Sequence, residues 1–190
     1  MALISWGRPK LYTKNADSAS AKAYEIPTPV ENSTNLTPTK GEKVEAKIEG
    51  GNNEDVIYKR STYALAYNVR KSKNRKAIYP ASDGLVSDHY GIMLQPEDDT
   101  CEGFFIESST VSVDDTYTAA DGAMWQITHD AVAAQTGDTV KWGTIKVTGE
   151  EGAKKVTFTE RSSAGSEPFT VTWDLDPEAN TNGAAGEPAE

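Results

Sequence analysis

Hydrophobic and polar residues alternate with a period of two along much of the chain, and the pattern is clearest over residues 62–69. The large side chains of this stretch stand at alternate positions: Tyr63, Leu65, Tyr67 and Val69. Successive side chains of a strand point to opposite faces of its sheet, so this period predicts a strand with one buried face. The aromatic and β-branched residues also favour a strand over a helix.

The preceding stretch, KGEKVEAKIEGG at residues 40–51, fits two structures. Val44, Ala46 and Ile48 alternate with charged residues, as in a strand with one solvated face. Val44 and Ile48 also stand four apart among strong helix formers, as in a helix. The glycines and asparagines at 50–53 are a turn signal between two alternating runs, and this context favours a hairpin over residues 40–58.

Further alternating runs predict strands at 76–80, 89–96, 124–132, 139–149, 154–160 and 168–175, and the run 103–113 predicts either two strands or one bent strand. Within the run 139–149 the alternation changes phase near Gly143, which predicts a β-bulge there. Short helical patterns occur only at 82–91 and 128–137. The expected fold class is therefore mainly β: an antiparallel β-sandwich or barrel with one short flanking helix, an extended N-terminal arm and a protruding hairpin.

The N-terminal arm is expected over residues 14–40, which are rich in Asn, Ser, Thr and Pro. Its prolines confine any strand there to a sheet edge: Pro27, Pro29 and Pro38. Before the arm, residues 2–6 are a short apolar strand candidate.

One β domain is expected over residues 1–175, with a core of about 1–148 and an additional hairpin at 154–175. Residues 176–190 are small, acidic and rich in Gly, Ala and Pro, and we expect them to be a disordered acidic tail.

Charge narrows the range of functions. The formal net charge is -10, from 19 basic and 29 acidic residues. The most basic stretch is RKSKNRK at 70–76, and tight nucleic-acid binding is not expected because that affinity comes from neutralising phosphates. Cys101 is the single cysteine, so no internal disulfide can form. Neither a signal peptide nor a membrane anchor is expected from the hydropathy pattern.

Catalytic chemistry finds no support in the motifs. His89 and His129 stand apart from any metal-ligand spacing, and we interpret both as structural residues. The oxygen-rich run 174–182 lacks the glycine and the glutamate that would complete a calcium loop. We therefore predict that the protein is not an enzyme and has no catalytic residues, no metal site and no cofactor.

Aromatic residues leave a second function class open. A sugar-binding platform would use exposed tyrosines, and the candidates are Tyr58, Tyr63, Tyr67, Tyr79 and Tyr90. Aromatic residues at strand spacing are more often core or interface residues. A carbohydrate- or surface-binding β-sandwich module is therefore the alternative to a protein built for self-assembly.

The order of segments resembles that of a known family. The run PTPVENSTNLTPTKGEKVEAKIEGGNNEDVIYKRSTYALAYNV (27–69) resembles the N-terminal half of phage major tail proteins, which build the tail tube. The run LQPEDDTCEGFFIESSTVSVDDTYTAADGAMWQITHDAVAAQTGDTVKWGTIKV (94–147) resembles their second half. The resemblance covers about residues 1–148 and consists of a pattern of segments with no catalytic signature.

This resemblance implies a structural function. Proteins of the family are similar to the inner tubes of contractile injection systems: they close into hexameric rings by joining their sheets, and the rings stack into a conduit for DNA or effector proteins. The implied partners are further copies of the chain, with tape-measure, sheath or baseplate proteins. DNA would pass without specific binding, and the location would be the virion tail of a phage or prophage after synthesis in the bacterial cytoplasm.

The charged hairpin and the strand that follows it are the expected contact region. We expect the assembly interface to include Val44, Ala46, Ile48, Val56 and Tyr58. Candidate acidic residues for the lumen or for ring contacts are Glu42, Glu45, Glu49, Glu54 and Asp55. A negative lumen would let DNA slide without sticking, because like charges repel.

Overall fold

Strands account for every regular element in the part of the chain that the structure describes, which confirms the predicted mainly β class. The structure is a computed structural model and describes residues 7–47, 49, 53–73, 75–134, 136–150, 152–161 and 167–176. In chain order the strands are β1 (Lys10–Asn15), β2 (Tyr24–Ile26), β3 (Asn35–Thr39), β4 (Lys43–Lys47), β5 (Asn53–Tyr58), β6 (Thr62–Arg70), β7 (Ala81–Ser82), β8 (Leu85–Val86), β9 (Tyr90–Gln95), β10 (Gly103–Thr118), β11 (Gly122–Ala131), β12 (Val140–Thr148), β13 (Lys155–Glu160) and β14 (Thr170–Asp174).

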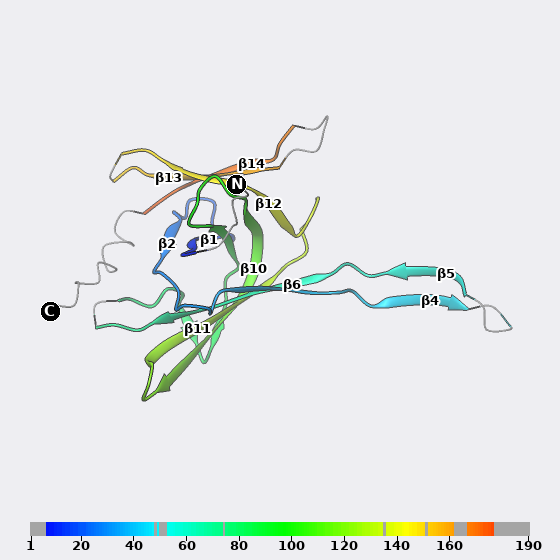
Figure 1. Ribbon diagram of the computed structural model, residues 1–190, viewed down its shortest axis with the longest axis horizontal. Coiled ribbons are helices and arrows are strands. Elements are labelled where there is room, and N and C mark those ends of the chain that lie inside the picture. Colours follow the sequence, from blue (N-terminus) through cyan, green and yellow to red (C-terminus); the bar gives the residue numbers. More distant parts are fainter. Residues whose placement is uncertain are drawn as a thin grey trace.

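The long strand β10 belongs to two layers. Its pairing register shifts between Ile106 and Ser109. Before the shift, β10 pairs with β9 and β12, and after it β10 pairs mainly with β11. One layer therefore runs β2-β1-β9-β10-β12-β13-β14, and the other runs through β10, β11, β6 and β3. Figure 1 shows β13 and β14 above, β6 and β11 below, and β10 passing between them.

The first layer closes on itself through Ala23, just before β2. The Ala23 N–H donates to the Asp174 carbonyl at 2.8 Å, and the Asp176 N–H donates to the Ala23 carbonyl at 2.7 Å. These bonds form a parallel bridge between Ala23 and Leu175, which joins the two ends of the layer. The result is a small barrel, in which the pairing of both outer strands limits the exposed edge.

Consecutive residues of the central strands face two different cores. Inside the barrel lie mostly aromatic and branched side chains: Tyr12, Ala23, Met93, Phe105, Ile145, Val156, Phe158 and Trp173. The larger core lies between the barrel and the second layer. Residues that adjoin the barrel residues in sequence contribute to this core: Leu11, Ile92, Phe104 and Ile106. Because successive side chains alternate in direction, a strand buried on both faces reads as a continuous apolar run such as GFFI at 103–106.

The predicted short helix is wrong at both of its candidate positions in the described chain. Residues 82–91 form the end of β7, β8 and the start of β9, and residues 128–131 belong to β11. Asp83 and Gly84 have positive φ values of 48° and 81°, which suit the two-residue turn between β7 and β8. An Asp-Gly pair is a hairpin signal, and it decides the local structure against the weak helical pattern. The predicted strand at 76–80 does not form either, although Tyr79 is buried.

The segment 14–40 lies along the body of its own chain. It holds the end of β1 and the short strands β2 and β3. The Val30 N–H donates to the Asn68 carbonyl at 2.8 Å, and the Asn68 N–H donates to Ser33 Oγ at 3.1 Å. Strand β3 ends the sheet order beside β6 and contains Pro38, in agreement with the expected edge position. The strand candidate 2–6 and the tail 177–190 lie outside the described residues.

The hairpin at 154–175 forms β13 and β14 and is part of the barrel. Val156, Phe158 and Trp173 are three of its buried side chains. The aromatic ring of Phe105 lies 5.3 Å from the ring of Phe158 and 5.6 Å from the ring of Trp173, between centroids. The segment therefore supplies a large share of the packing inside the barrel.

The bulge predicted at Gly143 is wrong, because β12 keeps one register with both neighbours. Gly143 pairs with Gly103 of β10 and with Glu160 of β13. The phase change in the sequence arises because Val140 faces the core between the layers, while Ile145 faces the inside of the barrel.

Substitution of Gly143 by Ala is expected to lower the free energy of unfolding by about 1–3 kcal/mol. A Cβ atom there would stand 2.0 Å from the Thr159 carbonyl oxygen and 2.8 Å from the Glu160 Cα, so the backbones of β12 and β13 would have to separate. Denaturant unfolding measures the change, with the exposed Lys146→Ala on the same strand as control, where we expect a change within about 0.5 kcal/mol. Equal stability of both variants would contradict the close approach.

Candidate functional site

The hairpin of β4 and β5 projects from the body of the protein (Figure 1). Its two strands pair with each other and with no other described strand. The stretch 43–47 is therefore a strand, as its context in the sequence predicts. At the base, the Lys59 N–H donates to the Glu42 carbonyl at 2.9 Å. Gly41 permits this approach, because a Cβ atom there would overlap the Lys59 carbonyl.

The register decides which side chains of the hairpin share a face. Val44 stands opposite Ile57, and Ala46 stands opposite Asp55. Directly opposed residues of an antiparallel pair point to the same side, so these four residues share one face. Glu45 opposite Val56 and Lys43 opposite Tyr58 form the other face. Val56 and Tyr58 therefore lie on the face opposite to Val44 and Ala46.

Exposed apolar side chains occupy both faces of the hairpin. The exposed fractions are 46% for Val44, 61% for Ile57, 38% for Val56 and 53% for Tyr58. Ile57 is absent from the residues expected from the sequence, because the run DVIY does not reveal which of its members face Val44. Only the register across the turn shows that Ile57 is the partner of Val44. The side chains of Ile48 and Glu54 lie outside the described residues.

Several charges of the hairpin are paired within it. Lys43 forms an ion pair with Glu45, and Lys59 Nζ lies 2.5 Å from Glu42 Oε2. Asp55 Oδ1 accepts the N–H of Val56 at 2.8 Å, and its side chain is exposed, as is that of Glu49. Exposed ion pairs add little stability, so these charges do not replace a packing partner for the apolar side chains.

A second candidate, in the body, is the hydrogen-bonded cluster around His129. Its Nδ1 lies 2.8 Å from Ser109 Oγ, and its Nε2 lies 3.1 Å from the Tyr67 hydroxyl and 3.0 Å from the Tyr79 hydroxyl. Ser109 donates its proton to the Tyr90 carbonyl at 2.7 Å. Ser109 Oγ must therefore accept a hydrogen bond from Nδ1–H, which leaves Nε2 to accept from a tyrosine.

The cluster around His129 is fully buried. His129 and Ser109 are both 0% exposed, so a substrate has no access to the serine and histidine pair. Burial also lowers the pKa of His129 to about 3, which keeps the ring neutral. Burial raises the pKa of Tyr67 and Tyr79 above the ordinary value. His129 is thus a buried, hydrogen-bonded residue of the core, and Tyr67, Tyr79 and Tyr90 are too deeply buried to form a sugar-binding platform.

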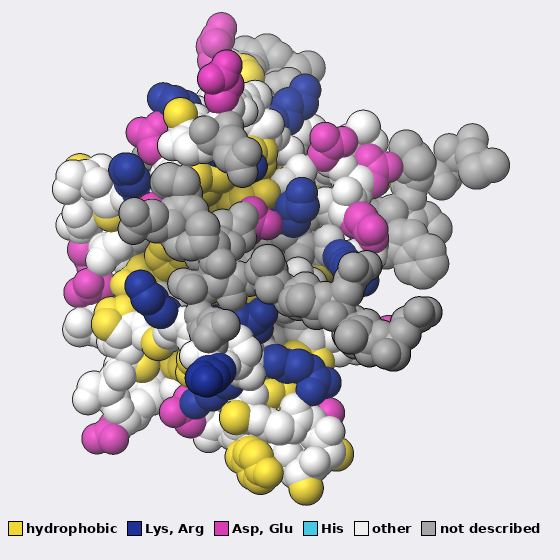
Figure 2. All heavy atoms as spheres, turned by 90° about the vertical axis from the view of Figure 1, so that its left-hand side faces the viewer, with side chains coloured by type: hydrophobic (Ala, Val, Ile, Leu, Met, Phe, Trp, Pro, Cys, Tyr) yellow, Lys and Arg dark blue, Asp and Glu magenta, His cyan; other side chains and the backbone are white. Residues whose placement is uncertain are grey.

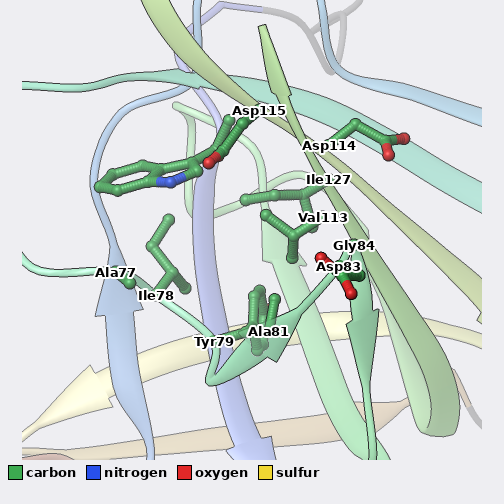
Figure 3. Close-up of a pocket in the computed structure, with 11 residues that line it drawn as sticks. Ala77, Ile78, Tyr79, Ala81, Asp83, Gly84, Val113, Asp114, Asp115 and Ile127 are labelled. Carbon is green, nitrogen blue, oxygen red and sulfur yellow. The ribbon is translucent and has the colours of Figure 1, made fainter.

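A cavity of about 390 Å³ lies beside the turn between β7 and β8, and Figure 3 shows the residues that line it. Val113, Ile127 and Tyr79 are among its apolar lining residues, and Asp83 and Asp115 are among its acidic ones. Lys71 Nζ lies 2.7 Å from Asp115 Oδ1 and 5.3 Å from the ring centroid of Trp125, another lining residue. The positive charge beside Asp115 at this cavity therefore comes from the Lys71 side chain. In the described residues, no group of three or more His, Cys, Asp or Glu side chains could hold a metal ion.

Comparisons of the chain with family models, with curated proteins and with solved structures find no significant match. No helix in the described part of the chain is long and apolar enough to cross a membrane. The geometry of the β4–β5 hairpin is therefore the basis on which a function can be proposed.

Proposed function

We propose that the protein is the structural protomer of a phage or prophage tail tube, and that its copies join into stacked rings, hexameric as in the family it resembles. The observation that carries the proposal is the projecting hairpin with the exposed pair Val44 and Ile57. A two-stranded hairpin alone is marginally stable in water, and its apolar face needs a packing partner. Its own body supplies no described strand beside it, so a second copy is the natural partner.

The open edges of the hairpin support the same proposal. Each strand of the two-stranded sheet pairs on one side only, so each outer edge has unpaired backbone groups. A neighbouring copy can continue this sheet by strand addition. The edge at β3 suits this less well, because Pro38 lacks a backbone N–H. The hairpin is thus the better place for sheets of two copies to join.

Assembly of the purified protein tests the proposal. We expect rings or tubes in negative-stain electron micrographs, and a mass in light scattering that grows with protein concentration. The double variant Val44→Ser with Ile57→Ser is expected to remain monomeric, because it removes the apolar pair, while its circular dichroism and melting temperature stay close to those of the original protein. This follows because neither residue belongs to either core of the body.

The matched control is Leu85→Ser, which changes another exposed apolar residue, 72% exposed, on the body of the protein. This variant is expected to assemble normally. A wild-type protein that stays monomeric at every concentration would contradict the proposed function. Normal assembly of the Val44 and Ile57 double variant would remove the hairpin from the interface.

A further inference from the structure

The basic segment 70–76 stands out in an acidic protein. Five of its seven residues are Lys or Arg, while the whole chain has a net charge of -10. Three of these cations have partners: Arg70 donates to the Asp121 carbonyl at 2.7 Å, Lys71 pairs with Asp115, and Arg75 donates to the Arg70 carbonyl. Lys73 and Lys76 are exposed and have no ion-pair partner among the described residues. Their charges are therefore available to another molecule.

The start of this segment is held against the hairpin of β10 and β11, and further bonds lie within the segment. The Lys71 N–H donates to the Ala123 carbonyl at 2.8 Å, and the Arg75 N–H donates to the Ser72 carbonyl at 3.1 Å. The Arg75 guanidinium also donates to the Arg70 carbonyl at 2.6 Å. Figure 2 looks onto this side of the molecule and shows Lys and Arg side chains grouped in its lower half. The described residues of the segment thus form a basic surface, and we call the segment 70–76 the basic loop.

Strand β6 separates the basic loop from the β4–β5 hairpin. The hairpin precedes β6 in the chain and the basic loop follows it, and Figure 1 shows them on opposite sides of the molecule. A strand of 9 residues is roughly 30 Å long, at about 3.3 Å per residue. The strands β4 and β5 therefore cannot contact the basic loop of their own chain.

The far end of the hairpin has the complementary charge. Residues 49–55 contain three acidic residues and no basic one. Two of the three, Glu49 and Asp55, are described as exposed, and neither has an ion-pair partner among the described residues. One end of the molecule thus presents acidic side chains, and the other end presents basic ones.

We propose that the basic loop of one copy receives the acidic end of the hairpin of the next copy, with Lys73 and Lys76 facing Glu49 and Asp55. This inference rests on the proposed function and names a contact within it. Such a contact joins two different surfaces, so it repeats from copy to copy and closes into a ring when the rotation allows. A nucleic acid is the less suitable partner, because the net charge of -10 repels phosphates.

Charge exchange tests the contact. The loop variant Lys73→Glu with Lys76→Glu, and the hairpin variant Glu49→Lys with Asp55→Lys, are each expected to need a protein concentration about tenfold higher or more for assembly, because like charges then face each other. The fourfold variant that combines them exchanges the signs and is expected to assemble nearly as the original protein does. The control Lys22→Glu with Lys146→Glu changes the net charge as much as the loop variant, at exposed positions outside the contact, and is expected to assemble normally.

The outcomes separate this contact from the proposed function. Normal assembly of both twofold variants would overturn the contact and leave the tail-tube proposal intact. Failure of the wild-type protein to assemble would overturn both. If a short DNA duplex bound the wild-type protein and not the loop variant, while both assembled alike, the basic loop would be a nucleic-acid surface and the proposed contact would be wrong.

Cross-linking provides a measurement that needs no variant. Carbodiimide joins a lysine amine to a carboxylate that it contacts. In assemblies made from equal amounts of ¹⁴N and ¹⁵N protein, we expect mixed-isotope peptide pairs that join Lys73 or Lys76 to Glu49 or Asp55. Assemblies whose cross-links omit these residues would contradict the contact.

Discussion

Lowering the pH from about 6.5 toward 3 is expected to remove several kcal/mol from the free energy of unfolding, because His129 is buried in its neutral form. The pKa of this residue is about 3 in the folded protein, against 6.5 for a solvated histidine. Between about pH 6.5 and 3, His129 therefore binds a proton in the unfolded chain and stays neutral in the folded chain. The stabilisation is fully present above pH 6.5 and declines as the pH falls toward 3, by roughly 5 kcal/mol when complete.

The measurement is denaturant unfolding at a series of pH values between 7 and 4.5, a range that lies above the ordinary pKa of carboxylates. The variant His129→Gln cannot gain this charge and should lose most of the slope. It should also be about 1–3 kcal/mol less stable at pH 7, because Gln cannot satisfy Ser109, Tyr67 and Tyr79 together. The matched control is His89→Gln, at an exposed pair with Asp17, which should keep the slope. An unchanged slope in His129→Gln would show that another group causes it.

Replacement of Phe105 by Ala is expected to cost about 3–5 kcal/mol of unfolding free energy. Phe105 is 2% exposed inside the barrel, where its ring contacts the rings of Phe158 and Trp173 from the C-terminal hairpin. Loss of the ring leaves a cavity that the paired strands around it cannot collapse to fill. The loss should appear as a lower denaturant midpoint.

Tyr117→Ala is the control for this prediction, since Tyr117 is an aromatic residue of the same strand with an exposed fraction of 77%. Its effect is expected to stay within about 0.5 kcal/mol. If Phe105→Ala were as stable as this control, the barrel interior would not depend on the β13–β14 hairpin in the way the packing indicates.

Local patterns were sufficient for elements that bury one face. The alternation over 62–69 corresponds to β6, whose Leu65, Tyr67 and Val69 are fully buried. Prolines predicted an edge strand, and β3 is one. The hairpin at 40–58 followed from its turn residues, although its helix propensity was high. In each case, the deciding information lay within a few residues in the chain.

The helix candidates failed for a different reason. The first part of the candidate at 128–137, residues 128–131, belongs to the strand β11, whose His129 is held by residues distant in the chain, Tyr67 and Tyr79. At 82–91 the Asp-Gly turn was the informative signal, and the spacing of apolar residues was misleading. The spacing of apolar residues over a few positions is similar in a short helix and in a strand that is buried on both faces. This spacing alone therefore cannot distinguish the two structures.

The sequence by itself determined the mainly β class, the place of the hairpin and the acidic balance, because alternation, turn residues and charge are local properties of the chain. Only the tertiary structure decided that β10 serves two layers, that the bridge at Ala23 closes the barrel and that Ile57 shares a face with Val44. It also separated the basic loop from the acidic end of the hairpin by the length of β6. These features depend on which strands pair and in which register. Pairing between segments that are distant in the chain cannot be inferred from the local residue pattern of either segment.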